Sequence, residues 1–294
     1  MRWVYGARVA VFGDTSGWWA PLGRQLTKLG VVFDDPAVPR QLQHWPDDLV
    51  VVQVGDLVHK GPESELAVAT VCELLLPTGR WVQLAGNHES QYLPGGVRFW
   101  EPPVHAVAAG WLQQLWRDRQ MVPAAGLIDT QAGAVLCTHA GLRPGLWHQL
   151  GGRSGVGGLV DVVAALNAAA GGDVSPAQRE AVFAAGSMLG QRSLPGVLWA
   201  EARHELVGDW RRWLHQRQEP LPFSQVHGHT LPLVLTTKGR RVPAELADIA
   251  RIVPGSRHVV CGLAGGQLVA VDPCAGAKAP TPPKPWLGSG WVCW

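Results

Sequence analysis

One pattern recurs four times along this chain: a short apolar run that ends in a polar motif. A continuous apolar run bounded by turn residues predicts a strand that is covered on both faces. Between the runs, apolar residues at helical spacing predict helices over 17–29, 64–76 and 107–120. Because ligands bind at the carboxyl ends of strands in α/β folds, we expect the polar motifs to share one site. The expected strands and their motifs are Arg8–Phe12 with Gly13-Asp14, Leu49–Val54 with Gly55-Asp56, Trp81–Leu84 with Gly86-Asn87-His88, and Ala134–Cys137 with Thr138-His139.

The second half of the chain has a different composition. Residues 143–223 are rich in Ala and Gly, and we expect them to be helical and to form a cap or insertion over the site. A single α/β domain is expected to span 1–275 with this cap inside it, followed by an irregular Pro- and Gly-rich tail over 276–294. Further elements are expected as a strand at 225–227 and a hairpin of 258–263 with 267–271.

Composition excludes several other classes of protein. Apolar residues make up 47% of the 294 residues, enough for a sizeable core, and the formal charge is only +2. So balanced a charge does not suggest sequence-specific nucleic-acid binding. No signal-peptide pattern or membrane-length apolar run is present, so we expect no membrane association. Five scattered cysteines without a C-x-x-C pair fit a reducing compartment, and a cytoplasmic location is expected.

The polar motifs together supply a set of metal ligands. Asp14 and Asp56 offer carboxylates, Asn87 an amide oxygen, and His139 and His229 imidazoles. An aspartate at a strand end is often only a turn residue, and a lone histidine is more often structural than a ligand. Apolar strands, however, do not require all five at their ends. Such a mixed set suits Mn, Fe or Zn, and a shared carboxylate can hold two cations close together.

The sequence resembles the calcineurin-like metallophosphoesterase family, in particular its phosphoprotein phosphatases and bacterial diadenosine-tetraphosphate hydrolases. That family's motifs are GD-x-H, GD-x-x-D-R-G, GNH-E, H-A-G and GH, and the resemblance spans residues 8 to about 271. It implies a fold of two stacked mixed β-sheets flanked by helices, with the site at the strand ends. The corresponding segments here are Gly13–Ser16, Gly55–Gly61, Gly86–Glu89, His139–Gly141 and Gly228–His229.

The resemblance also implies roles for individual residues. Asp56 would bridge two metals, Asp14 would serve the first, and His88 would protonate the leaving alkoxide. The expected activity is hydrolysis of phosphate esters by a metal-bound hydroxide, most simply with Mn²⁺, with Fe or Zn as alternatives. The substrate stays open between a phosphorylated small molecule, a nucleotide and a phosphoprotein. The second metal site would be completed by Asn87, His139 and His229.

The first family motif is incomplete in this chain. Ser16 stands where the family has a metal-binding histidine. A neutral hydroxyl is a poor ligand for these metals, so we expect one tight and one weak metal site. Three histidines are candidates by type to replace the missing ligand, although each is otherwise expected to be structural or exposed: His227, His204 and His258.

Two further departures concern the acid and the phosphate-binding residues. His59 occupies the position of the acid that orients the catalytic imidazole in the family, so Glu89 or a backbone carbonyl is expected to orient His88. Lys60 replaces the family's phosphate-binding arginine, and it keeps the charge but not the bidentate geometry. The remaining candidates for phosphate contacts are Asn87 and Arg203. Glu201 occupies the position where the family has a second phosphate-contacting arginine, and Arg203 follows two residues later.

The loss at Ser16 keeps a second function in view. A pseudophosphatase would bind a phosphorylated ligand, or a single metal, without turnover. Hydrolysis of para-nitrophenyl phosphate with added Mn²⁺, together with the metal content of the protein, discriminates between the two.

Overall fold

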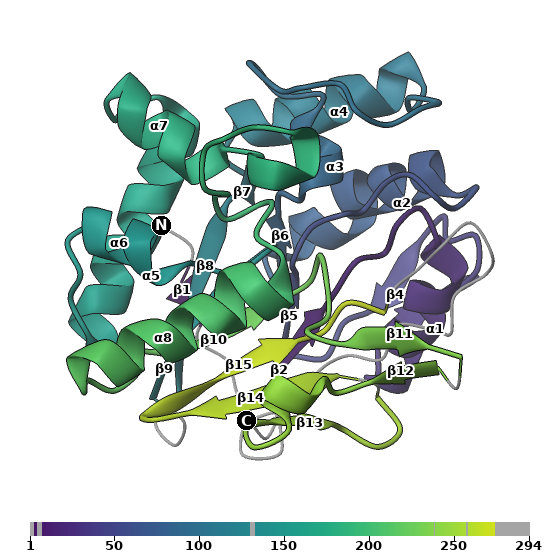
Figure 1. The fold of residues 1–294 in the computed structure, drawn as a ribbon. Helices are drawn as coiled ribbons and strands as arrows, with labels where there is room; N and C mark the ends of the chain where they lie inside the picture. The colour runs from purple at the N-terminus through teal and green to yellow at the C-terminus, as the bar shows by residue number, and fades with distance from the viewer. Residues whose placement is uncertain (1–2, 5–7, 130–132, 238, 257, 274–294) are drawn as a thin grey trace.

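The computed structural model describes residues 3–4, 8–129, 133–237, 239–256 and 258–273. Its architecture is a four-layered sandwich in which two stacked β-sheets lie between two layers of helices (Figure 1). The expected tail at 276–294 lies outside the described residues.

The smaller sheet has four strands in the order β2-β5-β6-β7. All its neighbouring pairs are parallel, so this sheet is not mixed as the resemblance implied. Phe12 pairs with Gln53, and Gln53 pairs with Gln83, so these strands end side by side. Their bounds are β2 Arg8–Phe12, β5 Leu49–Gln53, β6 Trp81–Leu84 and β7 Met121–Val122.

The larger sheet has seven strands in the order β1-β8-β9-β10-β15-β14-β13, and it is mixed. Its central strands β9, β10 and β15 are parallel to one another, so their carboxyl ends also meet at one edge. The strand bounds are β1 Trp3–Val4, β8 Ala124–Asp129, β9 Gly133–Thr138, β10 Ser224–His227, β13 Ala250–Ile252, β14 Val259–Leu263 and β15 Gly266–Ala270.

Both faces of each sheet are buried, as the continuous apolar strands predicted. Val52 and Val226, from different sheets, lie in one cluster between the sheets, whereas Val51 packs on the opposite face of β5. Helices α1, α2 and α4 cover that outer face and bury residues such as Leu22 and Leu112. Their bounds are α1 Trp19–Lys28, α2 Ser64–Thr70 and α4 Ala106–Arg117.

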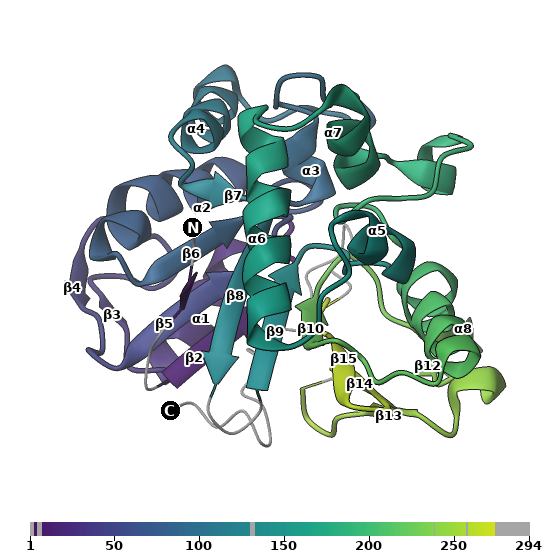
Figure 2. The same ribbon diagram turned by 90° about the vertical axis from the view of Figure 1, so that its left-hand side faces the viewer.

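The helices of residues 143–223 cover the outer face of the larger sheet (Figure 2). Leu159 and Leu166 of α6 pack in one cluster with Leu136 of β9 and Leu268 of β15. This region is therefore a layer of the sandwich, and its connecting segments are the parts that reach the site. The bounds are α5 Pro144–Gln149, α6 Gly155–Gly171, α7 Pro176–Phe183 and α8 Gly208–Arg217, with 3₁₀ and π turns at Gly186–Leu189 and Ala202–Val207.

Most expected elements are confirmed, and the differences have local causes. The helix expected over 64–76 changes at Val71 into a π turn and then a 3₁₀ turn. It ends where Pro77 lacks an N–H and Gly79 adopts φ 67°. Strand β8 was not predicted. The remaining elements are α3 Asn87–Ser90, β3 Val32–Phe33, β4 Leu42–His44, β11 Val234–Thr236, β12 Gly239–Arg241 and a 3₁₀ turn at Ala244–Leu246.

Within the described residues, no single helix has both the length and the apolar composition to cross a membrane. The pair α6 and α7, bent by 105°, passes that test only when the two are taken together.

Candidate active site

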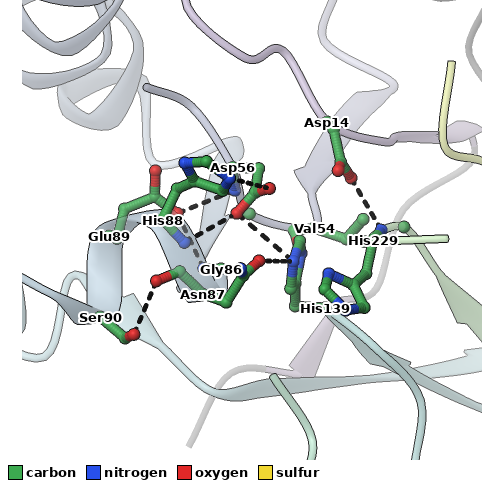
Figure 3. A network of polar contacts seen from close by, with 12 residues as sticks. Asp14, Val54, Asp56, Gly86, Asn87, His88, Glu89, Ser90, His139 and His229 are labelled. Carbon is green, nitrogen blue, oxygen red and sulfur yellow. Dashed lines mark hydrogen bonds and ion pairs between the residues drawn. The ribbon is translucent and has the colours of Figure 1, made fainter. Parts of the chain in front are cut away.

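Four of the predicted metal ligands come together where strands of the two sheets end (Figure 3). His139 Nε2 lies 2.9 Å from Asn87 Oδ1 and 3.4 Å from Asp56 Oδ1. Ligand atoms of Asp14, Asp56 and His139 all lie within 4.8 Å of one another. The two carboxylates and the imidazole are almost completely buried. The expectation that these motifs at the strand ends share one site is therefore confirmed.

The protonation pattern around His139 shows that this cluster fits a cation. His139 Nδ1 lies 2.9 Å from the Val54 carbonyl oxygen, which can only accept a hydrogen bond, so Nδ1 carries a proton. In a neutral ring, Nε2 then presents a lone pair to two oxygens, those of Asn87 and Asp56. A hydrogen atom or a cation must lie among these three atoms, because acceptors alone do not satisfy one another in a buried space. The arrangement therefore fits a bound metal ion.

Glu89 shapes the loop that carries Asp56. Its buried carboxylate accepts hydrogen bonds from the N–H groups of Asp56, Leu57 and Gly86, each at 2.8 Å. These bonds hold Asp56 at φ 55°, in the left-handed region. Because the carboxylate is occupied by backbone donors, the expectation that Glu89 orients His88 is wrong.

Gly86 permits the close approach of this loop to the next one. A Cβ atom at Gly86 would lie 2.3 Å from the Asp56 nitrogen, far inside van der Waals contact. The glycine of each motif is thus a packing requirement, and it brings Asn87 within reach of the other ligands.

Asp14 lies in a strongly acidic environment. Burial raises the pKa of Asp14 well above its usual value, and the neighbouring carboxylates of Asp272 and Asp56 raise it further. One oxygen, Oδ1, accepts the His229 N–H at 2.9 Å, whereas Oδ2 has no hydrogen-bond partner within the described structure. Burial likewise raises the pKa of Asp56, to about 6. A bound cation would lower both pKa values and satisfy Oδ2.

Asp272 was missed by the sequence analysis although a signal for it existed. It is buried, and it follows the predicted strand that ends at Val271, so the strand-end rule applied to it as well. Its backbone runs beside Gly13, where a Cβ atom would lie 3.1 Å from the Asp272 Cα.

None of the three candidate histidines joins the metal cluster formed by the described residues. His227 is buried and its Nδ1 lies 3.0 Å from the Gly228 carbonyl oxygen. The His204 backbone donates to Glu201, and His258, which is buried, immediately precedes β14. At the motif position itself, the Ser16 hydroxyl is fully buried and has no hydrogen-bond partner among the described residues.

His229 lies beside His139, with 5.0 Å between the ring centroids. Burial, and then the charges of His139 and Lys60, lower its pKa well below the usual value, so the ring is neutral and able to bind a metal. Its Nε2 lies 3.2 Å from the Met188 sulfur, on the 3₁₀ turn of the segment that covers the site. All five predicted ligands are thus gathered, and their roles as ligands stay predictions.

His88 is oriented by the histidine that replaces the family acid. His59 Nδ1 lies 2.7 Å from His88 Nδ1, and His59 Nε2 lies 2.5 Å from the Tyr92 hydroxyl oxygen. His88 Nε2 faces the metal cluster, 3.8 Å from Asp56 Oδ2. Burial lowers the pKa values of both imidazoles to about 3. Tyr92 was not identified from the sequence, because no motif residue predicts its contact with His59.

The two predicted phosphate-binding cations are placed differently. The positive charge of Lys60 acts on Asp56, where it is the largest influence opposing the effect of burial on the pKa. It also lowers the pKa of His88 and His229, so this positive charge lies near the cluster. Arg203 instead donates from Nε to Glu245 Oε1 at 2.6 Å. Its predicted contact with phosphate would require that ion pair to open.

A cavity of about 690 Å³ lies beside the site. It is bounded by the segment that follows the Gly-Asn-His motif, from Ser90 to Val97, and by parts of the 176–199 segment. Three aromatic side chains line it together with two arginines: Trp116, Phe183, Trp199, Arg179 and Arg192. Trp199 links the cavity to the metal cluster, since its ring lies 6.4 Å from that of His229.

The sequence profile of the calcineurin-like phosphoesterase family matches residues 7–162, more than half of the chain. The chain therefore belongs to the calcineurin-like phosphoesterase family. No curated protein sequence matches it.

Several solved phosphatase structures are similar to it at low sequence identity. A structure described as a diadenosine tetraphosphatase is 22% identical over 49% of this chain and 55% of that chain, with a TM-score of 0.32. The match thus spans little more than half of that structure. A cold-active protein-tyrosine phosphatase of a psychrophilic Shewanella species is 16% identical over 91% of this chain and 81% of that chain, with a TM-score of 0.45. A protein serine/threonine phosphatase of Saccharomyces cerevisiae is 14% identical over 92% and 69%, with a TM-score of 0.43. At these scores the similarities add no argument about substrate or mechanism.

Proposed function

We propose that this protein hydrolyses phosphate esters at a centre of two divalent cations, Mn²⁺ in the first instance. The observation that carries the proposal is the convergence of acceptor atoms at His139 Nε2, an arrangement that fits a bound cation. A ligand atom of Asp56 lies within 4.8 Å of those of both Asp14 and His139, so its carboxylate could serve two cations. When bound, the cations would acidify water and neutralise charge on the phosphoryl oxygens. The ligands that would hold them are Asp14, Asp56, Asn87, His139 and His229.

The protein's own groups have three tasks in this proposal. The Glu89 carboxylate fixes the Asp56 loop, so that little reorganisation is needed when substrate binds. Lys60 places a positive charge beside the cluster, where a phosphoryl oxygen is attracted. His88 presents Nε2 to the same space and protonates the leaving oxygen.

The cavity beside the cluster supports a substrate with a compact organic group. Its volume of about 690 Å³ lies within the range of small-molecule sites, and its aromatic walls suit a nucleobase or a similar ring. Arg179 and Arg192 would favour further negative charge on that substrate. A phosphorylated small molecule or nucleotide is therefore favoured over a phosphoprotein. The free cysteines Cys72, Cys137 and Cys261 support work in a reducing compartment such as the cytoplasm.

The test is His88→Asn, measured on two esters in Mn²⁺ with metal content determined in parallel. Loss of a general acid slows hydrolysis by about 10²–10⁴-fold when the leaving group is poor. Para-nitrophenyl phosphate, whose leaving group needs little protonation, should be affected much less, and bound metal should be retained. The matched control is His215→Asn, an exposed histidine on α8, which should change neither rate.

The alternative is a pseudophosphatase, and the buried Ser16 in place of a metal ligand is the observation that favours it. Metal binding without turnover of either ester by the unmodified protein would establish that alternative. Equal losses on both esters in His88→Asn would contradict the role of His88 as the acid. The proposal that the unmodified protein hydrolyses phosphate esters would still stand.

A further inference from the structure

His88 is the end of a chain of three buried or half-buried side chains that leads away from the metal cluster. Tyr92 contacts His59 at 2.5 Å, and His59 contacts His88 at 2.7 Å. We propose that Tyr92 and His59 are positioning residues that hold the His88 proton on Nε2 and resupply it during the reaction. The inference rests on the proposed function, since it concerns the acid of that reaction.

The direction of the hydrogen bonds follows from the far end of the chain. The Tyr92 hydroxyl oxygen accepts the N–H of Val104 at 2.8 Å, and a peptide N–H can only donate. The phenolic proton is then available for one acceptor. The Gln91 amide nitrogen Nε2, which can only donate, lies 3.5 Å from His59 Nε2. Its Oε1 accepts the Trp100 N–H at 3.1 Å. Among the described residues, His59 Nε2 is the acceptor in reach of that proton.

The tautomers of both imidazoles are fixed by this first bond. Because His59 Nε2 accepts from Tyr92, a neutral His59 carries its proton on Nδ1. That proton is donated to His88 Nδ1, so a neutral His88 carries its own proton on Nε2. Nε2 is the nitrogen that faces the Asp56 side of the cluster, where the substrate reacts.

Aromatic rings pack against the hydrogen-bonded side chains, and burial favours their neutral forms. The ring of Trp100 stacks on His59 with 6.1 Å between centroids, and Phe99 meets His88 edge-on at 5.2 Å. Burial, and then the charge of His88, lower the pKa of His59 to about 3, while burial raises the pKa of Tyr92. The phenol therefore holds its proton in the resting state.

The proton transfer balances without an imidazolium. As a water oxygen bonds to phosphorus, the bond from phosphorus to the leaving oxygen breaks, and that oxygen takes the proton from His88 Nε2. His88 Nδ1 receives the proton of His59 Nδ1, and His59 Nε2 receives the phenolic proton. A Tyr92 phenolate remains, which the Val104 N–H stabilises. The attacking water loses one proton to solvent, and a solvent proton that arrives at His88 Nε2 reverses the three transfers and restores the resting tautomers. The alkoxide is a stronger base than the phenolate, so the transfer runs downhill.

The kinetic test is Tyr92→Phe, which keeps the ring and removes the hydroxyl. We expect the rate with an alkyl phosphate to fall by about tenfold or more, as a part of the full contribution of general acid catalysis. The rate with para-nitrophenyl phosphate should change by less than about twofold, with metal content unchanged. The matched control is Thr70→Val, which removes a buried hydroxyl without a hydrogen-bond partner among the described residues, and both rates should be kept.

The structural test is independent of turnover. Nitrogen-15 NMR of the histidine side chains in the unmodified protein, with His88 assigned by its absence in His88→Asn, should show Nε2 protonated and Nδ1 unprotonated. His59→Asp replaces the donor by an acceptor and should move the His88 proton to Nδ1. A His88 proton on Nδ1 in the unmodified protein would overturn the proposal, as would equal losses on both esters in Tyr92→Phe. If the protein hydrolyses neither ester, the proposed function fails, and the NMR result still decides the tautomer.

Discussion

The predicted metal ligands around His139 come from both sheets, whereas fewer predicted ligands lie around Asp14. Asp56 and Asn87 follow strands of the smaller sheet, and His139 and His229 follow strands of the larger one. On the Asp14 side, the position that should add an imidazole holds Ser16, whose hydroxyl has no hydrogen-bond partner in the described part of the chain. In the proposed centre, one cation site would have four protein ligands, Asp56 among them, and the other would have only Asp14 and the shared Asp56. The comparison teaches that a single substitution can weaken one cation site while the neighbouring one stays complete.

The largest effect is expected from Asp56→Asn, because Asp56 belongs to both sides of the comparison. Loss of its charge should remove most bound Mn²⁺ and lower hydrolysis by more than about 100-fold, beyond the 10–100-fold typical of residues that only support a ligand. The substitution is isosteric, and Oδ1 can still accept the His88 N–H, so folding should be kept. Metal analysis and steady-state rates check this, with exposed Asp118→Asn as the control. Full metal content in Asp56→Asn would show that the cations lie elsewhere.

The apparent affinity for Mn²⁺ should fall as the pH falls through about 6. Burial raises the pKa values of Asp14 and Asp56, so in mildly acidic solution the metal-free protein holds protons that a cation must displace. The pKa of His229 is lowered, so that imidazole adds no competing proton in this range. One displaced proton corresponds to about a tenfold loss of affinity per pH unit. Calorimetry in buffers of different ionisation enthalpy measures the released protons, and binding without proton release at pH 5 would contradict the account.

A smaller change is expected when the family histidine is restored. Ser16→His should add a ligand on the Asp14 side and lower the Mn²⁺ concentration for half-maximal rate by several-fold. A gain of about 1.4 kcal/mol in the free energy of Mn²⁺ binding would correspond to a tenfold change. The gain is limited because Ser16 is completely buried, and packing a larger side chain there costs about 1–3 kcal/mol. Ser16→Ala is the control and should leave the Mn²⁺ dependence unchanged, since the hydroxyl makes no hydrogen bond with the described residues. A weakened Mn²⁺ dependence in Ser16→Ala would show that the hydroxyl is itself a ligand.

The strand-end rule predicted most of this site because it depends only on local pattern. Asp14, Asp56 and Asn87 each follow an apolar run, and parallel neighbours bring such ends together whatever the rest of the fold does. The same rule, applied to Val271, would have added Asp272.

Other contacts could not be predicted from the sequence, because they depend on how loops fold back. Glu89 bonds to a loop more than thirty residues earlier in the chain, and Tyr92 meets His59 only because the segment after α3 turns over it. The ion pair of Arg203 with Glu245 likewise joins distant segments, so the sequence offered no reason to place that guanidinium away from the phosphate.

Calorimetric titration of the metal-free, unmodified protein with Mn²⁺ tests the central claim most directly. The account predicts two binding events of unequal affinity: a tight one for the site completed by Asn87, His139 and His229, and a weaker one on the Asp14 side. Hydrolysis of para-nitrophenyl phosphate should continue to rise after the first equivalent has bound. Two equally tight sites would contradict the account, because they would require a strong ligand in place of Ser16, and the absence of any binding would refute the metal centre itself.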